Sequence, residues 1–264
     1  MGSNDFDFSM SNKKIAVITG ASSGMGRQFA LTLDSYGEFD EIWAIARRKE
    51  RLEQLKAPYP VRPVALDLSD QNSFSEYKEL LEKEKPTIGL LINASGFGKF
   101  DAVMDTGLTE NLNMVDLNCK AVIAMCQISI PFMKAGSQII NIASVAAFQP
   151  LPYINVYAAT KAFVVSYRRA LNRELKDIHV MALCPFWTKT EFFDRAVSEN
   201  KVVKKYIAMY LPEDIIKRAW RDAHRHKDVC MYGFKAKGQA LLVKILPHSL
   251  VMKVWMRQQE LTEK

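Results

Sequence analysis

Apolar residues in the first half of the chain occur in short unbroken runs, which alternate with segments of helical spacing. Runs of strand length, rich in β-branched residues, cover residues 14–19, 41–46, 61–66 and 88–93. Between them, apolar residues three or four apart predict helices over about 26–36 and 48–56. A third helix is expected to begin at Ser69 and Asp70 and to end before Pro86.

The same alternation continues through the second half of the chain. Helices are expected over about 108–133 and 154–176, and strands over 137–143 and 178–184. Strands that alternate with helices at this spacing predict a parallel β-sheet with helices on both faces. Because such connections are right-handed, the expected architecture is a Rossmann-type, doubly wound α/β fold.

A single domain is expected over residues 13–264, preceded by a flexible polar tail over residues 1–12. The alternation stops at residue 186, so we expect a substrate-side segment over about 186–226. An amphipathic helical segment is expected over about 236–260, and Pro247 should break or kink it. This segment would cover the cleft, lie on a membrane surface, or pack on the domain core or in a subunit interface.

A glycine-rich loop directly follows the first predicted strand. Residues 19–26 read Thr-Gly-Ala-Ser-Ser-Gly-Met-Gly, and a helix begins there. Glycine lets backbone N–H groups approach a pyrophosphate, and a helix N-terminus favours its negative charge. Between a strand and a helix, this spacing is typical of a dinucleotide site, with a purely structural tight turn as the alternative. The loop residues expected to bind the cofactor are Gly20, Ser22, Ser23, Gly24, Met25 and Gly26.

The turn after the second predicted strand indicates which dinucleotide is bound. An acidic residue there would bind the ribose hydroxyls of NAD. Here the strand runs into Arg47, Arg48 and Lys49, with no acid at the turn. Arginine can donate two charge-assisted hydrogen bonds to the 2′-phosphate of NADP. We therefore expect NADP(H) as the cofactor, with a solvated basic helix start as the structural alternative.

Tyr157 and Lys161 stand four residues apart in a predicted helix, so both side chains can reach one cleft. A free tyrosine has a pKa of about 10 and is a poor base at neutral pH. A lysine ammonium about 4 Å away, at an effective dielectric of about 20, favours phenolate by roughly 4 kcal/mol before desolvation opposes it. Ser144 ends the fifth predicted strand, where its hydroxyl can bind a substrate oxygen.

Together these motifs resemble the classical short-chain dehydrogenase/reductase family over roughly residues 13–190. The resemblance implies that Asn118 completes a catalytic set with Ser144, Tyr157 and Lys161, and that it holds a water linking Lys161 to solvent. The further cofactor contacts that it implies are Asp67, Leu68, Asn93, Ala94, Gly96, Pro185, Thr188 and Thr190, together with Tyr157 and Lys161.

Two segments depart from the family pattern. Residues 93–96 read Asn-Ala-Ser-Gly where the family usually has Asn-Asn-Ala-Gly, so the first Asn and the Gly are kept. After Pro185, Phe186 replaces the usual glycine, and a bulky side chain there could reshape the pocket beside the nicotinamide.

The composition is that of a soluble globular protein of 264 residues, with 48% hydrophobic and 25% charged residues. The formal charge is +7; residues 195–264 hold 15 Lys/Arg and 7 Asp/Glu, a balance of +8, so residues 1–194 sum to −1. Such a basic C-terminal quarter could face an anionic membrane, an acidic substrate or nucleic acid, or simply be solvated. We expect no nucleic-acid partner.

Cysteine spacing and apolar run lengths indicate the compartment. The four cysteines lack metal-ligand spacing, so reduced thiols and no metal are expected. No signal peptide is recognised, and no uninterrupted apolar run reaches the roughly 18 residues of a spanning helix. We expect a cytoplasmic protein, peripheral at a membrane if its basic C-terminal segment makes that contact.

The sequence thus predicts an NADP(H)-dependent oxidoreductase that transfers hydride between the nicotinamide and a carbonyl or secondary alcohol, with Tyr157 as general acid/base. The alternatives are a non-catalytic NADP-binding regulator and a membrane-associated interaction protein on the same fold. A lipophilic substrate is expected, such as a steroid-like or long-chain oxo compound, in a homo-oligomer, a dimer or tetramer. The residues expected to rim the cleft are Phe148, Leu151, Tyr153, Phe186, Trp187, Phe192 and Phe193.

Overall fold

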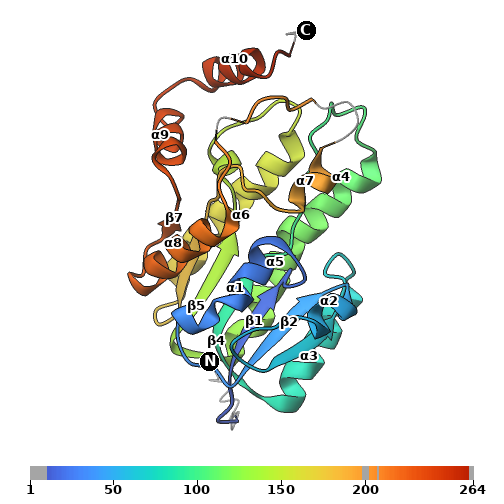
Figure 1. The fold of residues 1–264 in the computed structure, drawn as a ribbon, viewed down its shortest axis with the longest axis vertical. Coiled ribbons are helices and arrows are strands. Elements are labelled where there is room, and N and C mark those ends of the chain that lie inside the picture. Colours follow the sequence, from blue (N-terminus) through green and yellow to red (C-terminus); the bar gives the residue numbers. More distant parts are fainter. Residues whose placement is uncertain (1–10, 198–201, 207, 262–264) are drawn as a thin grey trace, which may run out of the picture.

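A seven-stranded parallel sheet forms the centre of the protein, in the order β3-β2-β1-β4-β5-β6-β7 (Figure 1). The computed structural model describes residues 11–197, 202–206 and 208–261, so most of the predicted tail lies outside the described residues. The strands are β1 (Lys14–Thr19), β2 (Glu41–Ala46), β3 (Val61–Ala65), β4 (Thr87–Asn93), β5 (Met133–Ile142), β6 (His179–Leu183) and β7 (Val229–Cys230). The expected doubly wound α/β fold is confirmed.

Helices cover both faces of the sheet, as the alternation predicts. They are α1 (Gly24–Leu31), α2 (Lys49–Glu53), α3 (Asn72–Glu84), α4 (Leu108–Val115), α5 (Ala121–Ser129), α6 (Asn155–Glu174), α7 (Phe192–Ala196), α8 (Pro212–His224), α9 (Phe234–Leu242) and α10 (His248–Gln258). Short 3-10 turns lie at Leu33–Ser35, Ile130–Phe132 and Val145–Phe148.

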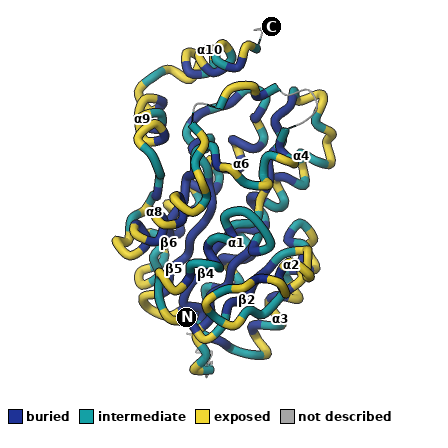
Figure 2. Tube along the Cα trace, in the orientation of Figure 1, coloured by how far each residue is buried: buried dark blue, intermediate teal, exposed yellow. Residues whose placement is uncertain are grey.

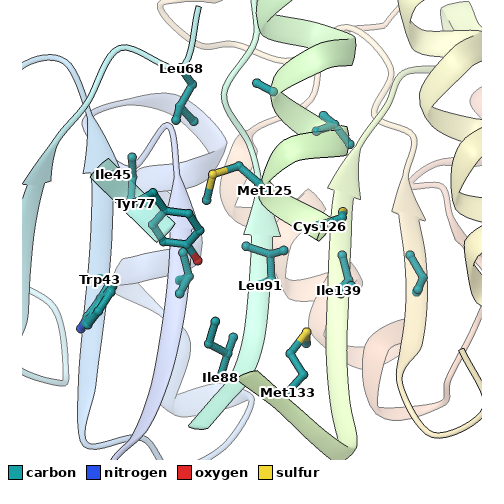
Figure 3. Close-up of a cluster of buried hydrophobic side chains, with 14 of the residues drawn as sticks. Trp43, Ile45, Leu68, Tyr77, Ile88, Leu91, Met125, Cys126, Met133 and Ile139 are labelled. Atoms are coloured by element: carbon teal, nitrogen blue, oxygen red, sulfur yellow. The ribbon is translucent and has the colours of Figure 1, made fainter. Parts of the chain in front are cut away.

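Each central strand sends alternate side chains into two separate cores. In β1, Ile15 and Val17 join the core under α3, α5 and α6, where Tyr77 and Met125 lie against the sheet (Figure 3). Ile18 of the same strand joins the opposite core, under α1 and α8. Both faces of the sheet are therefore buried, which is why the strands read as unbroken apolar runs.

The strand order reverses between β1 and β4, and this places the site. The loop after β1 leads to α1 on one face, and the loop after β4 leads toward α4 and α5 on the other. The Thr19 hydroxyl, at the end of β1, accepts hydrogen bonds from the backbone N–H groups of Ala94 and Ser95, each at 3.0 Å. In doubly wound sheets, ligands bind in the crevice at such a reversal, at the carboxyl ends of the strands.

The predicted long helix over residues 108–133 is not one regular helix. A π-helical turn, Asp116–Lys120, interrupts it, and a 3-10 turn ends it at Phe132. Among the described residues, Leu108–Phe132 is the one helical stretch long and apolar enough to match a membrane span by length and composition. Core helices of globular domains pass the same test, and Met125 and Cys126 of α5 are fully buried against the sheet.

The strand–helix alternation continues one unit further than predicted. After β6 the chain forms α7 and α8 and returns as β7, which pairs in parallel with β6. A two-residue strand is too short to produce a periodic pattern, so its pairing is visible only in the tertiary structure. Beyond β7, Pro247 separates α9 from α10, where the sequence predicts a break.

Candidate active site

The glycine loop adopts a backbone that requires glycine. Gly20 and Gly24 have φ angles of +66° and +53°, in the left-handed region that other residues rarely adopt. A Cβ on Gly20 would lie 2.9 Å from the Ala94 carbonyl carbon, and one on Gly26 would lie 2.5 Å from the Gly20 carbonyl oxygen. The loop is therefore held against the end of β4, and it presents Ser22 and Ser23 to an open groove.

That groove is one end of a cavity of about 960 Å³, which extends from the glycine loop to the C-terminal helices. Most of the predicted cofactor and catalytic residues line it together. They are Gly20, Ser22, Ser23, Gly24, Met25, Arg47, Arg48, Asp67, Leu68, Ala94, Gly96, Ser144, Tyr157, Lys161, Pro185, Thr188 and Thr190.

Three predicted residues do not line the cavity. The Asn93 amide turns into the core, where it donates a 2.8 Å hydrogen bond to Asn141 Oδ1. Gly26 packs beneath the backbone of Gly20, and its absent side chain is what permits that contact. Asn118 is fully buried behind the loop that follows β4.

Tyr157 and Lys161 lie one turn apart on α6 with both side chains buried at the cavity, as their spacing predicts. The Lys161 Nζ lies 5.6 Å from the centroid of the Tyr157 ring and donates a 2.9 Å hydrogen bond to the Ile142 carbonyl. The tyrosine ring is packed edge-on against Phe100, with the ring centroids 6.0 Å apart. Both groups are thus fixed in position at the end of β5.

Burial controls the protonation of this pair. It raises the pKa of Tyr157 to about 12, against the opposing effect of a hydrogen bond with Ser144. Burial likewise lowers the pKa of Lys161 to about 8. Desolvation is therefore the largest influence on both groups, and it opposes the lowering of the tyrosine pKa that the sequence alone suggests. At neutral pH the phenol is protonated and can donate a proton.

Ser144 lies where β5 ends, and its backbone geometry holds the hydroxyl in place. Its Oγ accepts a 3.1 Å hydrogen bond from the backbone N–H of Ala146, so the residue caps the short helical turn that follows. The N–H of Val145 donates to the Pro185 carbonyl at 3.0 Å and joins this turn to the segment after β6. Ser144 is thereby held at the cavity wall, within hydrogen-bonding reach of Tyr157.

Asn118 connects the loop after β4 to α6. It lies in the π-helical turn, where one extra residue per turn displaces its side chain from the ordinary helical position. Its Nδ2 donates to the Phe97 carbonyl at 2.8 Å and to Thr160 Oγ1 at 3.1 Å, while its Oδ1 accepts from the Phe97 N–H. Thr160 donates in turn to the Tyr157 carbonyl at 2.7 Å. Asn118 thus positions the backbone around Tyr157.

The basic turn after β2 contributes one residue that the sequence analysis missed. The Arg48 guanidinium donates to Ser22 Oγ at 3.2 Å and to Ser23 Oγ at 3.1 Å. Arg51, one turn further along α2, forms a two-pronged ion pair with Glu191 at 2.9 and 3.0 Å, and Arg48 lies 3.6 Å from the same carboxylate. Its spacing of three residues from Arg48 could have identified Arg51. Arg47 instead pairs with Asp67 at 3.7 Å.

Gly98 is a second residue that the sequence analysis missed. A Cβ at this position would lie 2.9 Å from Cδ2 of Tyr157 and 2.9 Å from Cζ of Phe192. No local pattern marks it, because the reason for glycine is the approach of two side chains from α6 and α7. The Tyr157 ring can occupy its position only while residue 98 has no side chain.

The far end of the cavity is apolar and aromatic. Five of the predicted rim residues line it, namely Leu151, Phe186, Trp187, Phe192 and Phe193. Phe148 packs instead against the core beneath α6, and Tyr153 does not line the cavity. Trp187 and Trp255 stack with centroids 6.5 Å apart, so the C-terminal helix α10 forms part of this wall. Among the described residues, no cluster of His, Cys, Asp and Glu could hold a metal ion.

Comparisons with known proteins agree with this geometry. A family model described as short chain dehydrogenase matches residues 14–201. An NADP-dependent 3-hydroxy acid dehydrogenase of Schizosaccharomyces pombe is 32% identical over 76% of this chain and 83% of its own. The human very-long-chain 3-oxoacyl-CoA reductase is 27% identical over 77% of this chain and 66% of its own.

Solved structures show the same fold. A short-chain dehydrogenase from Sphingobium yanoikuyae, in complex with NADPH, superposes with a TM-score of 0.74 at 26% identity. The match covers 89% of this chain and 96% of that chain. The resemblance inferred from the motifs is therefore confirmed.

Proposed function

Because the chain belongs to the short-chain dehydrogenase family, we propose that it transfers a hydride between NADP(H) and a carbonyl or secondary alcohol. The observation that carries this proposal is the meeting of Ser144, Tyr157 and Lys161 in the cavity that begins at the glycine loop. A non-catalytic NADP-binding regulator would have no need for a buried phenol and ammonium at this place. A steady-state assay with a panel of ketones, followed by NADPH absorbance, tests the proposal.

Each residue of the site has a separate role in the proposed reaction. NADP(H), when bound, supplies or accepts the hydride. In reduction the Ser144 hydroxyl hydrogen-bonds the substrate oxygen, and Tyr157 donates its proton to that oxygen as negative charge develops. Lys161, held by the Ile142 carbonyl, would hold the cofactor ribose, and its positive charge would favour the phenolate left on Tyr157. Asn118 positions the loop and the helix that carry these groups. We also propose that it holds a water that links Lys161 to solvent.

The groove fits a dinucleotide phosphate. The glycine loop lets the backbone approach the ligand closely. Gly96 also has no room for a side chain: a Cβ there would lie 2.8 Å from Asn118 Oδ1 and 3.4 Å from Lys161 Nζ. Arg48 is fixed on the loop serines, and Arg51 holds a carboxylate beside it. Arg47 and Arg48 line this end of the cavity, where their guanidinium groups could donate charge-assisted hydrogen bonds to a 2′-phosphate. The NADP assigned to relatives and structural neighbours is therefore proposed for this chain as well.

Replacing both Arg47 and Arg48 with alanine should weaken NADPH binding at least about tenfold and leave NADH binding within about threefold, because only NADPH carries the 2′-phosphate. Dissociation constants from cofactor titration measure this difference. Lys49→Ala is the matched control, since Lys49 belongs to the same basic turn, pairs with Glu53 and does not line the cavity. Equal weakening of both cofactors by the double substitution would show that the arginines are structural.

We further propose that the substrate is lipophilic, a steroid-like or long-chain oxo compound, because the far wall of the cavity is aromatic and aliphatic. Of the substrate side expected over about 186–226, the part up to residue 195 lines the cavity, as do α9 and α10, whereas α8 packs on the sheet beside α1. The enzyme is proposed to act as a homo-oligomer in the cytoplasm.

A series of 2-ketones of increasing chain length should show kcat/KM rising by up to about fourfold per methylene until the cavity is filled, since each buried CH₂ contributes about 0.8 kcal/mol. A small sugar ketone should be a much poorer substrate than the longest member. A flat series, or preference for the sugar, would contradict an apolar substrate site.

A further inference from the structure

The two C-terminal helices expose large apolar side chains to solvent. Phe234 is 80% exposed and Ile245 is 75% exposed, which is unusual for residues of this size. Figure 1 shows α9 and α10 extending outward from β7 beyond the sheet, and Figure 2 shows exposed positions along both helices. The members of this C-terminal apolar face are Phe234, Leu241, Leu242, Ile245, Leu250 and Val254.

Helix α9 is amphipathic with its apolar side outward. At about 100° per residue, Phe234 and Leu241 fall within roughly 20° of each other on the exposed side. Lys237 lies roughly 60° to one side of Phe234, and Lys235 lies roughly 100° to the other. Ala236 and Ala240, on the opposite side, are buried against the domain. Small residues thus pack inward, and bulky apolar residues between lysines point to solvent.

The charge around this face has one sign. Between residues 229 and 259 the sequence contains no Asp or Glu, and its cations are Lys235, Lys237, Lys244, Lys253 and Arg257. Within the described part of the chain, no carboxylate forms a salt bridge with any of these five. Their charge is therefore available to a partner.

A second exposed apolar segment has the opposite charge. Val103, Met104, Leu108 and Leu112 are also exposed around the start of α4, but the charged residues among them are Asp105 and Glu110, of which Glu110 pairs with Arg195 at 3.0 Å. Exposed apolar side chains are therefore found beside unpaired cations on the C-terminal helices, but not around the start of α4.

We propose that the C-terminal apolar face docks on an anionic lipid bilayer. Apolar side chains flanked by lysines are the arrangement that inserts between lipid headgroups while the cations remain at the negatively charged surface. A two-fold contact of this face with its own copy is disfavoured, because it would bring the same cations together. Leu242 and Val254 belong to this face and also line the cavity, so a docked bilayer would lie beside the cavity.

Flotation of the full-length protein with vesicles tests the proposal. Binding is expected with vesicles of phosphatidylcholine plus phosphatidylglycerol, is expected to fall with added salt, and should be weak with phosphatidylcholine alone. Phe234→Ser with Leu241→Ser, and separately Lys235→Glu with Lys237→Glu, should each lower the bound fraction at least about tenfold. Met104→Ser with Leu108→Ser is the matched control and should leave vesicle binding unchanged.

NADPH titration of each variant shows that it is folded, and size-exclusion chromatography reports its oligomeric state. Failure of the parent protein to bind anionic vesicles would overturn the proposal, as would equal binding of both C-terminal variants and the parent. If these variants changed the oligomeric state while the parent bound no vesicle, the face would be a contact between copies of the chain.

Discussion

Tyr157→Phe should lower kcat by about 10²- to 10⁴-fold, because it removes the proton donor to the substrate oxygen and leaves the rest of the cavity intact. The loss should fall on kcat rather than on cofactor binding, since the groove that holds the dinucleotide is built from the glycine loop, the arginines and Lys161. Single-turnover kinetics and an NADPH titration separate the two effects.

Tyr167→Phe is the matched control for this substitution. Tyr167 lies on the same helix, stacks on Phe163 with ring centroids 5.8 Å apart, and does not line the cavity. Its loss of a hydroxyl should leave kcat close to that of the parent. Turnover of Tyr157→Phe within tenfold of the parent would remove Tyr157 from the role of acid/base.

Gly98→Ala should lower kcat by about 10²-fold, because a methyl group at this position collides with the Tyr157 ring. Displacing a catalytic group by about 1 Å can lower the reaction rate by about 10²-fold. Phe192 can swing aside, but Tyr157 is backed by Phe100 and must itself move. Steady-state kinetics measure the loss, and NADPH affinity should change little.

Gly107→Ala provides the control for the added methyl group, since a Cβ there meets nothing within 4 Å. Because its φ angle of −59° suits any residue, the substitution introduces no backbone strain. Equal activity of Gly98→Ala and Gly107→Ala would mean that the Tyr157 ring tolerates the displacement, and that its packing against residue 98 is without consequence for the reaction.

Much of the fold follows from local patterns. The runs at Lys14–Thr19 and Glu41–Ala46 become strands with the predicted bounds, because an apolar run of that length can be buried on both faces only as a central parallel strand. The glycine loop and the four-residue spacing of Tyr157 and Lys161 are likewise local, so the sequence alone places them at a strand end and on one helix face.

Local patterns were insufficient where the deciding contact is made by distant residues. The π-helical turn at Asn118 and the short strand β7 leave no periodic signal, and both depend on packing partners far away in the chain. The same holds for the Asn93 amide, which the motif assigns to the cofactor and which the core instead pairs with Asn141.

The sequence by itself determined the strand–helix alternation of the doubly wound sheet, the glycine loop and the placement of Tyr157 and Lys161 on one helix face, because each of these patterns is local. Only the tertiary structure decided the protonation of that pair, since burial raises the pKa of Tyr157 to about 12 and lowers that of Lys161 to about 8. It alone also revealed Gly98, where the close approach of the Tyr157 ring leaves no room for a side chain. Burial and contacts between distant segments are properties of the folded chain, and no local pattern encodes them.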